Sequence, residues 1–173
     1  MQWHLAGAVL VVTGSGGWGY LIARQLRRRP VELRAAAQAV ELLRSEIEYG
    51  GTPLPEALEH VGRRTGGPVR RLCLETSATL SGPDGSSASE AWHRALIGAA
   101  VVAAWSEPDV ATLAQLGDAL GATGTADQVR HIELCLARLR VAEEEASAVA
   151  ATHARMWMYL GVLAGLGMVV LGV

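Results

Sequence analysis

The chain has 173 residues, of which half are hydrophobic and only 18% are charged. Its formal net charge of −2 leaves no basic excess, and this argues against a protein that binds nucleic acid. The stretch between the two apolar ends is long enough for one compact domain with its own core.

Charged residues are absent from both ends of the chain. Residues 5–23 and 156–173 each run for roughly 18 or 19 residues without a charge. At about 1.5 Å of rise per residue, either stretch spans most of a ~30 Å hydrocarbon layer as a helix. The sequence therefore predicts transmembrane helices at 5–23 and 156–173, flanking a domain at 24–155. The alternatives are a cleaved signal peptide for the first stretch and a buried core helix for the second.

Arginines flank both apolar stretches on the same side. Arg24, Arg27, Arg28 and Arg29 follow the first stretch, and Arg155 precedes the second. Under the positive-inside rule, the domain between them lies in the cytoplasm and both chain ends lie outside.

The first apolar stretch contains a glycine pattern with two interpretations. Gly14, Gly16 and Gly19 fit G-x-G-x-x-G, the fingerprint of a dinucleotide-binding fold. No second strand ending in an acidic residue follows, so the context required by that fold is missing. The other interpretation is close packing of membrane helices, in which Gly14 acts together with Gly161 and Gly165.

The segment after the first arginines has a helical period. Apolar residues recur every three or four positions from Leu33 to Ile47, and Gly50-Gly51 end this predicted helix. Thr52 and Pro53 are predicted to begin the next helix as its cap and its first residue.

Four further helices follow, separated by recognisable breaks. Residues 65–68 end the second helix, and the third covers 69–80. A loop over 81–87 ends in a capping box from Ser87 to Glu90. The inward face of the fourth helix is predicted to carry Ala91, Trp92, Ala95 and Leu96. Ser106 caps a fifth helix that ends near Leu120.

The longest helix closes the domain. It is predicted to open with a capping box of Thr125 and Gln128 and to pass without a break into the last apolar stretch. Its inward seam is predicted to contain Ile132, Cys135, Leu139, Ala142, Ala146 and Val149. The fold class is therefore all-α, with a six-helix cytoplasmic bundle between two transmembrane helices.

No constellation of residues supports catalysis. Cys73 and Cys135 are isolated on predicted helices, which favours reduced core cysteines, although a disulfide stays open. The five histidines are dispersed, without metal-ligand spacing. We therefore predict no catalytic residue, no cofactor and no metal site, and a protein that is not an enzyme.

Several segments together resemble one family. The block Glu46-Ile47-Glu48-Tyr49-Gly50-Gly51-Thr52-Pro53-Leu54-Pro55-Glu56-Ala57-Leu58 is the most specific. The other matching segments are 116–121, 128–132, the glutamates 143–145 and 157–165. With these features the whole chain resembles the stage III sporulation protein AB family of endospore-forming bacteria. One departure is Thr123-Gly124, where the family pattern leads us to expect Ser-Asp.

The resemblance implies a function. The family is similar, more distantly, to the cytoplasmic domain of the inner-membrane platform (F-type) protein of type II secretion and type IV pilus machines. It implies a platform component of a secretion-like channel complex between mother cell and forespore, in the outer forespore membrane on the mother-cell side. The implied partners are a cytoplasmic secretion-type ATPase (stage III sporulation protein AA), other membrane subunits of the complex and further copies of this chain.

A candidate docking surface follows from the specific block. A helix end, an exposed aromatic and several acids are predicted to meet there, and the glutamate run is a second candidate contact. The candidate partner-binding residues are Glu46, Glu48, Tyr49, Pro53, Glu56, Glu143 and Glu144. The alternatives are that Tyr49 and Pro53 only build the turn and that the glutamates only form a solvated face. A free-standing membrane-anchored helical adaptor is the alternative function, and a dinucleotide-binding enzyme is the least favoured.

Overall fold

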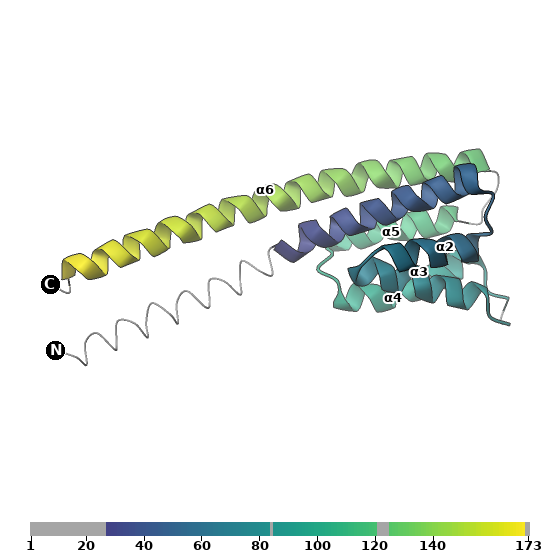
Figure 1. Cartoon of the computed structure of the whole chain (residues 1–173), viewed down its shortest axis with the longest axis horizontal. Coiled ribbons are helices and arrows are strands. Elements are labelled where there is room, and N and C mark those ends of the chain that lie inside the picture. The colour runs from purple at the N-terminus through teal and green to yellow at the C-terminus, as the bar shows by residue number, and fades with distance from the viewer. Residues whose placement is uncertain (1–26, 84, 121–124, 172–173) are drawn as a thin grey trace. The chain divides into compact units, whose positions relative to one another are not determined.

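The structure, a computed structural model, describes residues 27–83, 85–120 and 125–171 (Figure 1). These residues form helices and no strand, as the sequence predicts. The first helix covers 27–45 and continues into a π-helical turn, η1 (Glu46–Gly50). The others are α2 (Leu54–Arg64), α3 (Gly67–Leu80), α4 (Ala88–Val102), α5 (Glu107–Ala119) and α6 (Thr125–Leu171). The all-α class with six helices is therefore confirmed.

The predicted transmembrane helices receive no support from the structure. Over the part of the chain that is described, no helix is both long and apolar enough to cross a membrane. The first predicted span, 5–23, lies outside the described residues, and so do Gly14, Gly16 and Gly19. The backbone of α6 covers Gly161 and Gly165, but the side chains around them are not described.

The chain divides into two compact units. One consists of Met1–Arg28 with Glu145–Val173, and the other is Arg29–Glu144. The second unit is the helical bundle, and it holds every contact described below.

Helices that follow one another in the bundle pack side by side (Figure 1). α2 meets α3 where Gly62 lies against Leu74, and a Cβ at position 62 would come within 2.8 Å of the Leu74 side chain. α3 meets α4 where Arg71 and Glu75 lie over Gly98. Since the connections are short, successive helices run in alternating directions, as is usual for neighbouring elements.

The first helix buries the face that its period predicts. Leu33, Ala36, Val40 and Leu43 are each at most 2% exposed. The helix ends as predicted, because Gly51 adopts the left-handed conformation (φ +55°) that favours glycine.

The predicted cap of the second helix is wrong. α2 begins at Leu54, with Pro53 as its N-cap, and Pro55 occupies the first turn, where no backbone N–H is needed. Thr52 therefore lies outside the helix, and its hydroxyl donates instead to the carboxylate of Glu46 at 3.3 Å.

The starts of α4 and α5 follow the sequence signals. Ser87 and Glu90 form the predicted capping box, and the hydrogen bond from the Ser87 backbone N–H lowers the pKa of Glu90. At α5 the backbone N–H of Ser106 donates to Asp109 at 2.8 Å. The Ser106 hydroxyl accepts from Arg29 at 3.0 Å.

Trp92 is the largest fully buried side chain. Its indole Nε1–H donates to the carbonyl of Leu113 on α5 at 2.8 Å. The ring lies on Gly117, where a Cβ would come within 2.2 Å of the Trp92 ring. Glycine at 117 is thus what allows α4 and α5 to approach each other around the indole.

The predicted seam of α6 is confirmed in its first half. Ile132, Cys135 and Leu139 are buried, as is Ala146, while Ala142 is half-buried. The prediction for Val149 is wrong, because this residue is 50% exposed. A row of residues with heptad spacing rotates by about 20° per heptad around a straight helix. Toward the C-terminal end of α6 this row therefore turns away from the buried face of the helix.

The seam prediction also missed a residue, and the expectation for the cysteines is confirmed. Leu136 is buried next to the seam. Cys73 and Cys135 are free and buried, and burial raises the pKa of each thiol to about 12.

The first and last helices of the bundle lie side by side and are joined by ion pairs (Figure 1). Arg34 pairs with Glu143 at 2.6 Å, although 109 residues separate them. Arg140 on α6 pairs with Glu41 at 3.1 Å. The bundle is therefore closed by contacts between its two chain ends.

Candidate partner-binding surface

Among the described residues, the most exposed aromatic side chain lies at the end of the first helix. Tyr49 is 80% exposed on the π-helical turn η1. Such turns are rare and frequently mark functional positions. A tyrosine exposed to this extent contributes little to the core.

The five residues predicted around this turn lie on η1 and at the start of α2. Glu46 lies between the Thr52 hydroxyl at 3.3 Å and the His60 ring at 3.9 Å. Glu48 pairs with Arg44 at 3.2 Å. Pro53, the N-cap of α2, is exposed, and so is Glu56 in the first turn of that helix, where the helix dipole favours an acid.

A hollow opens beside Tyr49. It has a volume of about 220 Å³ and is lined by Glu41, Arg44, Ser45, Glu48 and Tyr49. The sequence analysis missed Glu41, Arg44 and Ser45. The signal was available, since residues four apart on a helix share a face: 41, 45 and 49 form one row, and 44 and 48 another.

Arg44 links the hollow to the last helix. Besides Glu48, its guanidinium contacts Glu133 on α6 at 3.1 Å. These side chains are partly exposed, and such pairs contribute little stability. Arg44 therefore connects a residue that lines the hollow, Glu48, with α6.

The two glutamates of the acidic run lie elsewhere. Glu143 pairs with Arg34, and the Glu143 side chain is only 18% exposed. Glu143 therefore does not belong to a fully solvated face. Glu144 is exposed. Ten helical residues separate Glu143 from Glu133 beside the hollow, or about 15 Å along α6. The structure therefore does not place the glutamate run in the surface around Tyr49.

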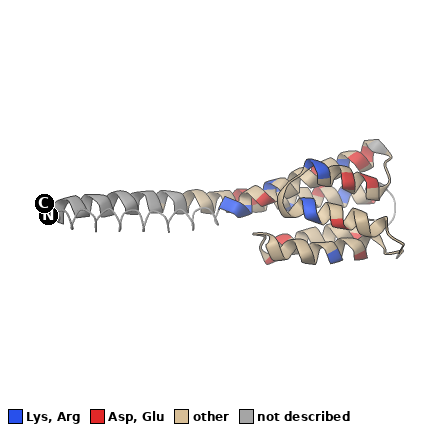
Figure 2. Cartoon of the chain, turned by 60° about the horizontal axis from the view of Figure 1, so that its bottom comes forward, with Lys and Arg blue, Asp and Glu red and all other residues tan. Residues whose placement is uncertain are grey.

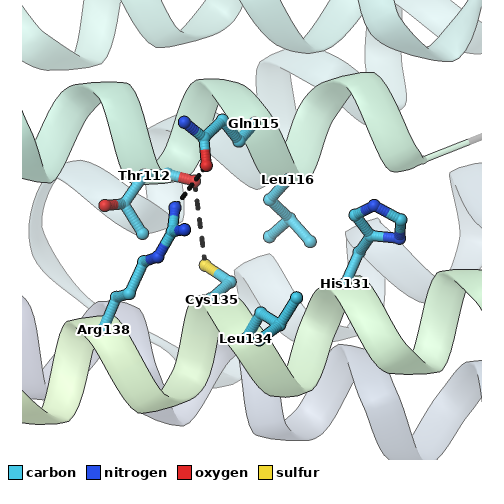
Figure 3. Close-up of a pocket in the computed structure, with 7 residues that line it drawn as sticks. All are labelled: Thr112, Gln115, Leu116, His131, Leu134, Cys135 and Arg138. Atoms are coloured by element: carbon cyan, nitrogen blue, oxygen red, sulfur yellow. Dashed lines mark hydrogen bonds between the residues drawn. The ribbon is translucent and has the colours of Figure 1, made fainter.

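A second, smaller cavity lies between α5 and α6 (Figure 3). It has a volume of about 40 Å³ and is lined by Thr112, Gln115, Leu116, His131, Leu134, Cys135 and Arg138. This is room for water but far below the size of a ligand pocket. Arg138 donates to Gln115 at one end, and Cys135 points at the Thr112 carbonyl, 4.0 Å away.

The described residues contain no group of three or more His, Cys, Asp or Glu that could hold a metal ion. Acidic and basic positions are both spread over the described helices, among many uncharged ones (Figure 2). The strand that a dinucleotide fold needs after its glycine loop is missing from the described chain, although the loop itself lies outside it.

Sequence reasoning also missed a buried ion pair. Arg29 donates to Asp109 at 2.9 and 3.1 Å, and Asp109 is only 2% exposed. Burial raises the pKa of Asp109, but the hydrogen bonds from Arg29 and Ser106 outweigh it and leave the pKa below its ordinary value. Glu32 accepts the backbone N–H of Ala104 at 2.6 Å nearby.

Taken together, the helices and the surface define a bundle protein whose described part presents an aromatic and acidic turn to solvent. The sequence model of the family described as stage III sporulation protein AB matches residues 4–171. The chain belongs to the stage III sporulation protein AB family.

Two relatives agree with this assignment. The stage III sporulation protein AB of Bacillus subtilis (strain 168) is 32% identical over 168 residues, which are 96% of this chain and 97% of that protein. A solved structure of a stage III sporulation protein AB superposes with a TM-score of 0.67 at 29% identity, and covers 72% of this chain and 97% of its own. The resemblance predicted from the sequence is thereby confirmed.

Proposed function

We propose that this protein is a non-enzymatic platform component of a secretion-like sporulation complex between mother cell and forespore. In this role it docks a cytoplasmic secretion-type ATPase, stage III sporulation protein AA. The observation that carries the proposal is Tyr49, 80% exposed on a π-helical turn among carboxylates, in a chain of a sporulation family.

The proposal includes attachment to the outer forespore membrane on the mother-cell side. Its support is the sequence: residues 5–23 and 156–173 carry no charge, and arginines border both stretches on the side of the bundle. Gly14, Gly161 and Gly165 would allow close approach of these segments to each other or to other subunits.

The surface around Tyr49 suits a basic partner. An exposed tyrosine is a typical anchor residue at the centre of an interface. The neighbouring Glu46, Glu48 and Glu56 add negative charge, which raises the rate of association with a basic patch. The hollow of about 220 Å³ beside the ring has room for one long side chain of the partner.

The same surface is connected to the last helix. Arg44 lies between Glu48 and Glu133, and α6 continues as one helix to Leu171. In the proposed mechanism, a change in the docked ATPase shifts this junction, and α6 carries the displacement along the chain.

A pull-down of the ATPase by the full chain, held in detergent or nanodiscs, tests the proposal. The chain is expected to retain the ATPase, and Tyr49→Ala is expected to lower the affinity at least tenfold, as for a hot-spot residue. Val141→Ala is the matched control, because Val141 is 55% exposed on α6, away from the turn.

Each result decides a different part of the proposal. Equal losses for the two variants would contradict this surface while leaving an ATPase contact in place. Failure of the folded full chain to retain active ATPase would favour the other function, a free-standing membrane adaptor.

A further inference from the structure

The bundle has a second unusual surface, at the end opposite Tyr49. Because successive helices alternate in direction, the end at which the first helix begins also holds the ends of α2 and α4 and the starts of α3 and α5 (Figure 1). The contact from the Ala104 N–H to Glu32 at 2.6 Å and the pairing of Arg29 with Asp109 confirm this arrangement.

Two exposed arginines give this end positive charge. Arg64 is the last residue of α2, and Arg70 lies in the first turn of α3. Their neighbours Arg63 and Arg71 are engaged with Glu59 and Glu75 in ion pairs of 2.5 and 2.6 Å. Glu107, at the start of α5, is an exposed acid at the same end.

Exposed apolar side chains accompany the arginines. Ile97 and Val101 are four residues apart on the last two turns of α4, and they are 71% and 81% exposed. Val102 beside them is 49% exposed. Large aliphatic side chains grouped on a helix end are unfavourable in water and indicate a surface that meets an apolar environment.

The points at which the chain enters and leaves the bundle indicate which apolar environment this end contacts. The bundle unit begins at Arg29 and ends at Glu144, and the pairing of Arg34 with Glu143 shows that the chain enters and leaves it on the same side. From both points the sequence leads into the uncharged stretches 5–23 and 156–173. The end that carries the apolar residues is therefore the end at which the chain enters the bundle, directly after the arginines that follow residues 5–23.

We propose that this end of the bundle rests on an anionic lipid surface. Its contact residues are Arg64, Arg70, Ile97, Val101 and Val102. The arginines pair with lipid phosphates, and the aliphatic side chains enter the headgroup region, as in peripheral membrane helices. The inference rests on the proposed membrane attachment and adds an orientation to it: Tyr49 points away from the bilayer, at the far end of a first helix about 35 Å long.

The test places a spin label at Val101→Cys in the full chain, reconstituted in nanodiscs with or without phosphatidylglycerol. The native Cys73 and Cys135 are buried with pKa values near 12, so they react slowly, and labelled wild type gives the background. Collisions with oxygen and with a water-soluble nickel complex report the surroundings of the label. Ser81→Cys, exposed at the opposite end, is the control.

In anionic nanodiscs the label at Val101→Cys is expected to gain oxygen contact and lose nickel contact, relative to Ser81→Cys. The double change Arg64→Glu and Arg70→Glu is expected to return the accessibility of the label to the control value.

If the chain is incorporated but the label stays as accessible to nickel as the control in both lipids, the inference is wrong and membrane attachment stands. If the label gains oxygen contact equally in neutral lipid and with both arginines reversed, recognition of anionic lipid is overturned. If the label loses contact with both reagents, this end meets protein and the lipid contact is overturned. If no nanodisc retains the chain, the proposed membrane attachment is itself wrong.

Discussion

Arg29 has a structural role that its position in the sequence conceals. It ends a run of arginines after an apolar stretch, and such runs usually report membrane orientation. In the structure its side chain pairs with Asp109, 80 residues further along the chain, and also binds the Ser106 hydroxyl. The pair joins the start of the first helix to the start of α5.

The first prediction concerns the pH dependence of this pair. Because the folded state lowers the pKa of Asp109, its stabilisation is complete above the unfolded value of about 3.9 and is lost as the pH falls through the folded value. Asp109→Asn is expected to lower the unfolding free energy by about 2–4 kcal/mol near neutral pH and by less at pH 3. Urea unfolding followed by circular dichroism at pH 7, 5 and 3 measures this. Asp118→Asn, at a 65% exposed side chain, is the control with little effect. A loss for Asp109→Asn that does not change with pH would contradict the assignment.

A second prediction concerns Gly117, which lies under the Trp92 ring. Gly117→Ala is expected to cost about 1–3 kcal/mol of stability, because the new Cβ would overlap the buried indole. Gly98→Ala is the matched control within α4, since its Cβ would meet only the ends of Glu75 and Arg71, at 3.4 and 3.6 Å. This change is expected to be neutral or to stabilise by up to ~1 kcal/mol. Thermal unfolding followed by tryptophan fluorescence compares the two variants, and equal effects would rule out overpacking at Gly117.

For single residues, the helical spacing of apolar positions predicts well which side chains are buried. Trp92, Leu33 and Ile132 were expected inside from helical spacing alone, and all are buried. The Arg29–Asp109 pair could not be predicted in this way, because it depends on which helix ends meet in space. No spacing rule relates residues that are 80 positions apart.

The ends of the helices show which element boundaries the sequence can predict. The box of Ser87 and Glu90 and the stop at Gly51 were predictable because each acts within a few residues. The start of α2 was misplaced because two prolines, Pro53 and Pro55, compete for the first turn. The π-helical turn of η1 was not predicted, since no simple residue pattern encodes it.

The third prediction tests the turn after η1. Gly51→Ala is expected to lower the unfolding free energy by about 1–2 kcal/mol, because the residue has φ +55° in open space. Gly66→Ala is the control, as Gly66 also has open space but lies in the extended region. Guanidinium titrations of both variants measure the difference. A Gly51→Ala protein as stable as Gly66→Ala would mean that the turn relaxes without cost.

The candidate surface was predictable in part for the same reasons. Tyr49, Glu48 and Pro53 lie within one short block, so their proximity follows from the chain itself. The hollow beside Tyr49 depends also on Arg44 and its contact with Glu133, a residue of α6 that only the folded bundle brings close.

For the whole molecule, stability depends on the closure of the bundle by α6. Leu139→Ala is expected to cost about 2–5 kcal/mol, because this side chain is 1% exposed. Leu134→Ala removes the same atoms from a residue of the same helix that is 50% exposed, and is expected to cost less than about 1 kcal/mol. The midpoint of urea unfolding compares the two. Similar midpoints would show that α6 contributes little to the core.

The same closure has a consequence for the synthesis of the chain. The apolar face of the first helix leaves the ribosome early, while Glu133, Arg140 and Glu143, which pair with that helix, follow about a hundred residues later. Contacts so distant in sequence form late and slow the folding of a domain. The hairpins of α2 to α5 can form in the meantime from neighbouring segments. We therefore expect a nascent chain released before residue 132 to be collapsed but open along one side, with Leu33, Val40 and Leu43 available to chaperones.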